Sequence, residues 1–277
     1  MILRCDRLTV AASGARLVPD ELWALAEPLI PPAKERPQGG GRSRTDPRAV
    51  FTAIVFVLTS GCAWRHLPPS FGVSVPTAHR TFTEWTEAGQ WRQLHHTVLD
   101  ELGSRGLIDW SRAVLDGASV RAKKRGGLTG PSPVDRGKPG SKIHALSDRA
   151  GLPLTVAVSA ANTHDSHALK PLVNAIPAIR SRRGPRRRKP AKLHADKAYD
   201  IPALRDWLRR CRIIPHIARK GIESNEKLGR HRWVIERTIA WLTGYRRLTI
   251  RYERKPSHYL AFLTLGATIT CYKKLAK

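Results

Sequence analysis

Cysteine is scarce in this 277-residue chain, and its four copies lie far apart. Cys5, Cys62, Cys211 and Cys271 form no CxxC pair and no cluster with histidine. Their spacing suggests neither a disulfide framework nor a zinc site. Isolated thiols are typical of a reducing compartment, so we expect a cytoplasmic protein.

Long hydrophobic runs are also missing. The N-terminus has no uninterrupted apolar stretch of the signal-peptide kind. The longest late apolar run, residues 259–272, is shorter than the roughly 20 residues that a membrane-spanning helix needs. We therefore expect no membrane partner, and we expect this run to form a buried closing helix.

Acidic residues are few: 22 Asp and Glu stand against 49 Lys and Arg, a formal net charge of +27. Apolar residues make up 41% of the chain, which is enough to build a core and argues against disorder throughout. A strongly basic chain with a core usually has a polyanionic partner, and nucleic acid is the leading candidate. A ribosome-associated or merely basic protein is the alternative that charge alone leaves open.

Helical signals dominate the first part of the chain. Apolar residues recur at helical spacing over 22–29, and a polar, glycine-rich linker follows over 33–46. A second helix is predicted from Pro47 to Gly61, with Asp46 as its N-terminal cap. A third is predicted from about Ser74 to Gly89. The predicted domain, residues 17–108, is all-α.

Two consecutive helices with a basic exposed face on the second are typical of a helix-turn-helix. His79 and Arg80 lie early in the candidate recognition helix and are expected to contact DNA. A three-helix bundle that never touches DNA is the alternative.

From about residue 110 the periodicity becomes strand-like, which predicts a second domain over 110–277. The predicted order is β-β-β-α-β-α-β-α, typical of a mixed sheet with helices on both faces. The predicted strands and helices are residues 112–120, 141–148, 152–159, 165–178 (helix), 191–198, 201–211 (helix), 212–219 and 229–248 (helix). The fold class is therefore α/β, preceded by an all-α region.

Three acidic residues of this second part are candidate catalytic residues. Asp116 interrupts the first strand, Asp196 ends the fourth, and Glu236 lies in the last long helix. A charge inside a buried strand is costly unless it is paired, and carboxylates that meet can bind Mg²⁺ or Mn²⁺. A single Asp could instead pair with an arginine, and Glu236 with Arg232 one turn earlier. Asp200 is interpreted as a helix cap.

Basic, Gly- and Pro-rich loops interrupt the second domain at 121–142 and 180–192. The first leaves the strand that carries Asp116 and would lie beside a bound metal. Further candidates for contacting DNA phosphates are Lys138, Lys142, His144, Arg232 and Arg237.

Long ordered segments resemble bacterial DDE transposases of the insertion-sequence-five family, from about Pro19 onward. The segments that carry the resemblance are "LWALAEPLIPP", "GGRSRTDPRAVFTAIVFVLTSGCAWRHLPPSFG", "GPSPVDRGKPGSKIHALSDRAGLPL", "ANTHDSHAL", "ADKAYD" and "RWVIERTIAWLTGYRRL". The resemblance implies an RNase H-like catalytic domain with Asp116, Asp196 and Glu236 as catalytic acids and ligands of two Mg²⁺ ions, with Mn²⁺ as a substitute.

The same resemblance implies a transposase that binds the terminal inverted repeats of an insertion sequence, then cleaves the DNA and joins it to a target. Its partner would be double-stranded DNA, and pairing two ends would need a homodimer or a larger assembly in the bacterial cytoplasm, on the nucleoid. A catalytically silent DNA-binding regulator derived from a transposase is the alternative.

One departure from the family pattern concerns the residues around Glu236. Related transposases often place a Tyr, an Arg and a Lys at fixed distances from this Glu. Arg232 matches, but Gly229 stands at the Tyr position and Thr243 at the Lys position. The candidates to replace them are Tyr245, Arg246 and Arg247, and Arg246 is the one we expect to contact DNA.

Overall fold

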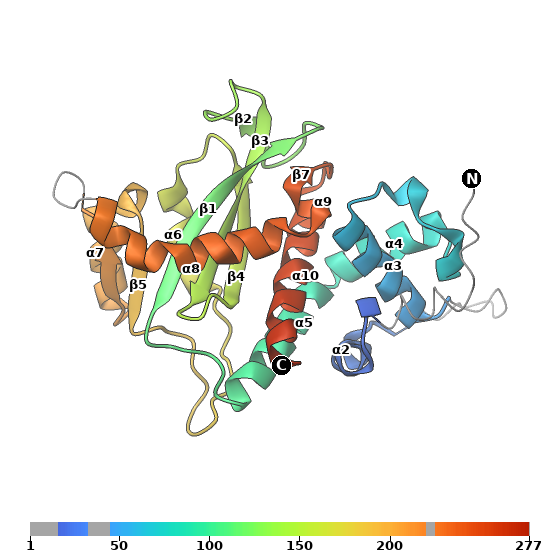
Figure 1. The fold of residues 1–277 in the computed structure, drawn as a ribbon, viewed down its shortest axis with the longest axis horizontal. Coiled ribbons are helices and arrows are strands. Elements are labelled where there is room, and N and C mark those ends of the chain that lie inside the picture. The colour runs from blue at the N-terminus through green and yellow to red at the C-terminus, as the bar shows by residue number, and fades with distance from the viewer. Residues whose placement is uncertain (1–15, 33–44, 220–224, 277) are drawn as a thin grey trace.

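The computed structural model describes residues 16–32, 45–219 and 225–276, with side chains described except at 225–232. A helical region built from the first part of the chain lies beside a larger sheet-containing region, as Figure 1 shows. Helices α5 (Gln90–Ser104) and α10 (Pro256–Leu275) lie between them. The described residues include no helix long and apolar enough to span a membrane.

The helical region contains the helices that the sequence predicts. They are α2 (Asp20–Ala26) with the 3-10 turn η1 (Glu27–Leu29), α3 (Pro47–Ser60) and α4 (Val75–Glu87). Helix α3 begins and ends as predicted: the Asp46 carboxylate accepts hydrogen bonds from the backbone N–H groups of Arg48 and Ala49, at 3.0 and 3.2 Å. Gly61 ends the helix at φ 71°, a left-handed conformation that favours glycine.

The connection between α3 and α4 is longer than the tight turn of a helix-turn-helix. It runs over residues 61–74 and contains two 3-10 turns, η2 (Trp64–His66) and η3 (Pro69–Phe71). Helix α4 then begins after Ser74, whose hydroxyl accepts a hydrogen bond from the Thr77 N–H.

Helix α5 is a further element that was not predicted from the sequence. It follows Gly89, at φ 73°, and packs along α10.

The mixed sheet has β1 (Ala113–Ala122) at its centre. On one side, β3 (Pro139–Asp148) pairs antiparallel with β1, and β4 (Pro153–Ala160) pairs antiparallel with β3. On the other side, β5 (Lys192–Ala195) pairs parallel with β1, and β6 (Ile214–Ile217) pairs parallel with β5. Two short strands, β2 (Gly130–Pro131) and β7 (Ile250–Arg251), extend the edges of β3 and β1. The order β4-β3-β1-β5-β6 is RNase H-like and confirms the predicted fold class.

The remaining helices flank this sheet, and α8 crosses in front of it in Figure 1. They are η4 (Asp165–Ala168), α6 (Leu169–Asn174), η5 (Lys197–Tyr199), α7 (Pro202–Arg210), α8 (Asn225–Thr243) and α9 (Arg246–Thr249).

Three predictions about these flanking helices were wrong. The helix expected over 165–178 is a 3-10 turn followed by the short α6. The one expected over 229–248 ends at Thr243, before Gly244. Asp200 does not cap α7: its carboxylate accepts a hydrogen bond from Arg205 Nε at 2.8 Å, and Ile201 stands at the N-cap position of α7.

One continuous core runs through both regions, from Val18 to Tyr272. Phe82 of α4 is fully buried and lies 4.5 Å, centroid to centroid, from Phe262 of α10. Trp64 and Trp91 also pack against the Phe82 ring. Helix α10 is buried along most of its length, as predicted for the closing helix.

Candidate active site

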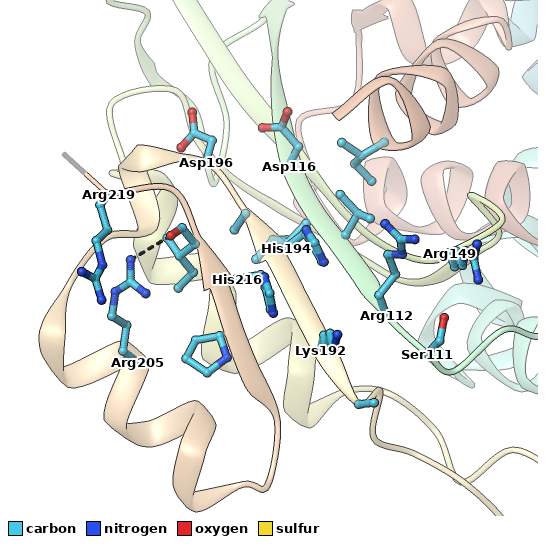
Figure 2. Close-up of a pocket in the computed structure, with 17 residues that line it drawn as sticks. Ser111, Arg112, Asp116, Arg149, Lys192, His194, Asp196, Arg205, His216 and Arg219 are labelled. Carbon is cyan, nitrogen blue, oxygen red and sulfur yellow. Dashed lines mark hydrogen bonds between the residues drawn. The ribbon is translucent and has the colours of Figure 1, made fainter. Parts of the chain in front are cut away.

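Strand register places Asp116 and Asp196 at the same level of the sheet. The parallel strands β1 and β5 pair Ala113 with Leu193 and Val114 with His194. Continuing that register sets Asp116 opposite Asp196, the first residue after β5. Figure 2 shows the two carboxylates next to each other at one rim of a pocket that both residues line. The structure therefore brings together two of the three predicted acids.

Local backbone contacts orient both carboxylates. Asp116 Oδ1 accepts a hydrogen bond from the N–H of Gly117 at 2.8 Å. Asp196 is the N-cap of η5, and its Oδ1 accepts from the N–H of Ala198 at 2.5 Å. Both aspartates are half-buried and line the pocket.

The pocket below the acidic pair is lined with positive charge. Its volume is about 850 Å³, and its floor includes Leu115 and Ile217. The imidazole rings of His194 and His216 stack there at 4.9 Å, with 15° between their planes. The cationic residues that line it are Arg112, Arg149, Lys192, Arg205 and Arg219. We name this cavity the basic pocket.

These cationic residues were not predicted from the sequence as residues of a functional site. They lie on or beside β1, β3, β5, β6 and α7, and the pairing of these strands brings them together. Because arginine and lysine side chains hold phosphate oxygens, an acidic pair beside such a pocket suits a polyanionic strand whose reacting phosphate lies at the acids.

Glu236 does not join the acidic pair in this structure. It is exposed on α8, although its neighbour Ile235 is buried and lines the basic pocket. Within the described part of the chain, no group of three His, Cys, Asp or Glu side chains could hold a metal ion. The donor chemistry of Asp116 and Asp196 still fits a hard divalent cation, because two neighbouring carboxylates supply oxygen ligands.

His79 and Arg80 lie on the exposed face of α4, where a DNA contact was predicted. The His79 ring also contacts Trp64 and His258, at centroid distances of 5.4 and 5.8 Å. The Arg80 side chain is 71% exposed and lies 3.9 Å from Glu84. His79 lines a second cavity, of about 510 Å³, together with Lys124, Arg254 and Lys255 of the sheet region. We name it the junction pocket.

Of the three residues predicted to hold phosphate beside β3, only Lys138 is well exposed, with its Nζ 3.8 Å from Asp135. Lys142 is 14% exposed, and its Nζ lies 3.0 Å from Asp165 Oδ1 and donates to the carbonyl of Thr163. His144 is 1% exposed and its Nε2 hydrogen-bonds the Ser159 hydroxyl. Burial lowers its pKa to about 4, which keeps it neutral. The geometry thus speaks against direct phosphate contacts by Lys142 and His144, because protein groups already surround them.

Helix α8 carries two of the residues predicted to contact DNA, Arg232 and Arg237. The side chain of Arg232 lies outside the described residues. Arg237 is sandwiched between the exposed Trp233 and Trp241, at 4.5 and 4.7 Å from their ring centroids, and its Nη2 donates to the Ala150 carbonyl.

The three candidate replacements for the missing Tyr and Lys also differ in exposure. Arg246 is exposed at the start of α9. Tyr245 is buried, and Arg247 is buried in an ion pair with Glu253 at 2.7 Å. Of these three, only Arg246 has a side chain open to DNA.

An RNase H-like sheet that carries an aspartate on its central strand and another directly after the neighbouring parallel strand has the architecture of a DDE nucleotidyl-transfer domain. Comparison with known proteins agrees. Residues 18–95 match the family described as "Putative transposase of IS4/5 family (DUF4096)", and residues 107–271 match the family described as "Transposase DDE domain". The chain belongs to the transposase DDE family and is a DNA transposase.

Two proteins of Burkholderia cepacia are similar in sequence to parts of this chain. A "Putative transposase for insertion sequence element IS402" of Burkholderia cepacia is 44% identical over 149 residues, which cover 54% of this chain and 71% of that protein. An "Insertion element IS402 uncharacterized 16.2 kDa protein" of the same organism is 42% identical over 119 residues, covering 42% and 81%. Among solved structures, a piggyBac transposase synaptic complex with hairpin DNA aligns at a TM-score of 0.47 and 9% identity, covering 98% of this chain and 76% of that one.

Proposed function

We propose that this transposase binds the terminal inverted repeats of an insertion sequence, cleaves DNA at the element ends and joins the released 3′ ends to a target, with divalent metal ions. The observation that carries the proposal is the Asp116–Asp196 pair at the rim of the basic pocket. A protein that only binds DNA gains nothing from two carboxylates facing its phosphate groove, because they repel the phosphates.

Asp116 and Asp196 would hold Mg²⁺, with Mn²⁺ as a substitute, and Glu236 is proposed as the third acid. When bound, such ions make the attacking water or hydroxyl more acidic and stabilise the charge on the leaving oxygen. The chain's own residues have two tasks. The acids fix the position of the reacting phosphate, and the arginines and lysine of the basic pocket hold the neighbouring phosphates.

We further propose a division of labour between residues 17–108 and 110–277. The exposed face of α4, with His79 and Arg80, would read the inverted repeat. The duplex would run from α4 across the junction pocket to the sheet region, because Lys124, Arg254 and Lys255 line this pocket together with His79. Further contacts along the sheet region are proposed for exposed Lys138 and Arg246, for half-buried Arg237 and for Arg232.

Pairing of two element ends makes a homodimer or a larger assembly part of this proposal. The working compartment proposed for it is the bacterial cytoplasm, on nucleoid DNA.

The test is cleavage of a plasmid that carries the element's own ends, in Mg²⁺, by the wild type and by Asp116→Asn, Asp196→Asn and Glu236→Gln. We expect each variant to retain binding of the ends in a gel-shift assay and to lose cleavage. Asp206→Asn is the matched control, because Asp206 is an exposed acid whose partner is Arg209 on the same helix. Cleavage should appear with Mn²⁺ and should fail in Ca²⁺, whose coordination is looser.

Each result assigns or removes a role. A variant that cuts like wild type removes that acid from the catalytic set. Full cleavage in a chelator removes the metal mechanism. A wild-type protein that binds the ends and never cuts would instead be a DNA-binding regulator derived from a transposase, the alternative consistent with the exposed position of Glu236.

A further inference from the structure

Buried polar atoms without a hydrogen-bond partner gather behind the acidic pair. In the described part of the chain they include the Tyr199 hydroxyl, Asp165 Oδ1 and His144 Nδ1. These three groups are neighbours: η4, which carries Asp165, contacts η5, which carries Tyr199, and the Asp165 charge acts on His144. A buried polar atom left without a partner costs about 1–3 kcal/mol, so the Tyr199 hydroxyl and His144 Nδ1 point to a ligand or to ordered water; Asp165 Oδ1 has an ion-pair partner in Lys142 but no hydrogen bond.

Tyr199 is almost fully enclosed, with 1% of its surface exposed, as is His144. Its position is fixed by the turn that follows Asp196, because the Tyr199 N–H donates to the Asp196 carbonyl at 3.1 Å. Burial and then the charges of Asp165, Asp116 and Asp196 raise the pKa of its phenol well above the ordinary value. The tyrosine thus sits in the turn that directly follows Asp196, beside the element that carries Asp165, and its hydroxyl has no hydrogen-bond partner.

Asp165 is held from behind by Lys142. The Lys142 Nζ lies 3.0 Å from Asp165 Oδ1 but outside hydrogen-bond alignment with it, and it donates instead to the Thr163 carbonyl at 2.9 Å. The ion pair fixes the carboxylate and leaves the hydrogen-bonding capacity of Oδ1 unused. Lys142 was expected to hold DNA phosphate; its position gives it this internal task.

We propose that Tyr199 is a positioning residue of the active site. Its hydroxyl donates a hydrogen bond to the water shell of the cation that Asp116 and Asp196 would hold, and Asp165, fixed by Lys142, accepts one from the same shell. This inference rests on the cation site of the proposed function. Groups directly behind metal ligands orient the ligands and their waters, and their loss typically lowers metal affinity about 10- to 100-fold.

The test is Mn²⁺ binding to the full chain without DNA, measured by electron paramagnetic resonance of the free ion. Tyr199→Phe removes only the hydroxyl and keeps the ring in the core. We expect it to raise the Kd for Mn²⁺ about tenfold, and Asp165→Asn to raise it as well. The thermal stability of metal-free Tyr199→Phe should be equal to or higher than that of wild type, because the variant removes an unsatisfied buried group.

Tyr245→Phe is the matched control. Tyr245 is also a buried tyrosine, but its hydroxyl lies 3.4 Å from Thr270 and it has no carboxylate among the groups that shift its pKa. Its Mn²⁺ affinity should equal that of wild type.

The possible outcomes distinguish the role of Tyr199 from the cation site at Asp116 and Asp196 on which it depends. If Asp116→Asn loses Mn²⁺ binding while Tyr199→Phe binds like wild type, the role of Tyr199 is refuted and the cation site stands. If Tyr199→Phe loses stability with unchanged Mn²⁺ affinity, the tyrosine is only structural. If wild type and Asp116→Asn bind Mn²⁺ equally, the cation site and the role of Tyr199 fail together.

Discussion

Replacing Arg251 by methionine tests how the sheet region holds the loop that follows β1. Arg251 belongs to β7, is fully buried, and directs its guanidinium at backbone carbonyls. It donates to the carbonyls of Glu253 and Leu128 at 2.9 Å each, to that of Gly127 at 2.6 Å, and to that of Arg254 at 3.3 Å. A further bond, of 2.7 Å, goes to the Ser141 hydroxyl.

The expected cost follows from these contacts. Methionine has a similar length and no donor, so four carbonyl oxygens and one hydroxyl would lose a charged partner inside the protein. Removing one side of a buried charged network typically costs about 3–5 kcal/mol. At about 2–4 °C per kcal/mol, the melting temperature should fall by roughly 6–20 °C.

The assay is urea and thermal unfolding of wild type, Arg251→Met and the control Arg121→Met. Arg121 is exposed, and its only described ion pair is a 4.0 Å contact with Asp135, so its loss should change stability by less than about 0.5 kcal/mol. Trypsin should also cut Arg251→Met faster after residues 123–125, because the loop held by Arg251 follows them. A loss below about 1 kcal/mol would refute the reasoning and show that water replaces the guanidinium at little cost.

Three further predictions concern the core. Burial of the His95 ring lowers its pKa to about 4, although the hydrogen bond to the Pro153 carbonyl acts in the opposite direction; because the unfolded chain protonates near pH 6.5, about 3 kcal/mol of stability should be lost as the pH falls from 6.5 to 4, and His95→Gln should flatten this part of the pH–stability curve. Phe82→Ala opens a cavity between the helical region and α10 and should cost about 3–5 kcal/mol in urea unfolding; a cost below about 1 kcal/mol would show that the two regions are stabilised separately. Gly103→Ala places a Cβ within van der Waals overlap of the Arg180 carbonyl oxygen and should cost about 1–3 kcal/mol by thermal unfolding; unchanged stability would mean that the 180 segment moves away freely.

Local sequence signals predicted the elements that depend on adjacent residues. Asp46, Pro47 and Gly61 bound α3 because capping and left-handed backbone need only the residues beside them. The alternation around Asp116 predicted its strand in the same way. Such signals are short-range, so they survive whatever the rest of the chain does.

The same signals failed where long-range packing decides. Asp200 pairs with Arg205 instead of capping α7. Lys142 and His144 were predicted to contact DNA phosphates because they belong to or follow a basic loop. Lys142 is instead half-buried and His144 buried, because β3 pairs with β1 on one side and β4 on the other. Burial depends on which strands become neighbours, and no local pattern encodes that.

For the site, the amino-acid sequence by itself determined the chemistry available: a basic chain, an aspartate within a strand, another directly after one, and a glutamate on a late helix. Only the tertiary structure decided their geometry. The register of β1 with β5 sets Asp116 opposite Asp196, and it gathers scattered arginines and histidines into the basic pocket. It also leaves Glu236 outside that pair and encloses Tyr199 behind it. The physical reason is that charges and hydroxyls act over a few ångströms of space, and that separation is set by the packing of elements far apart in the chain.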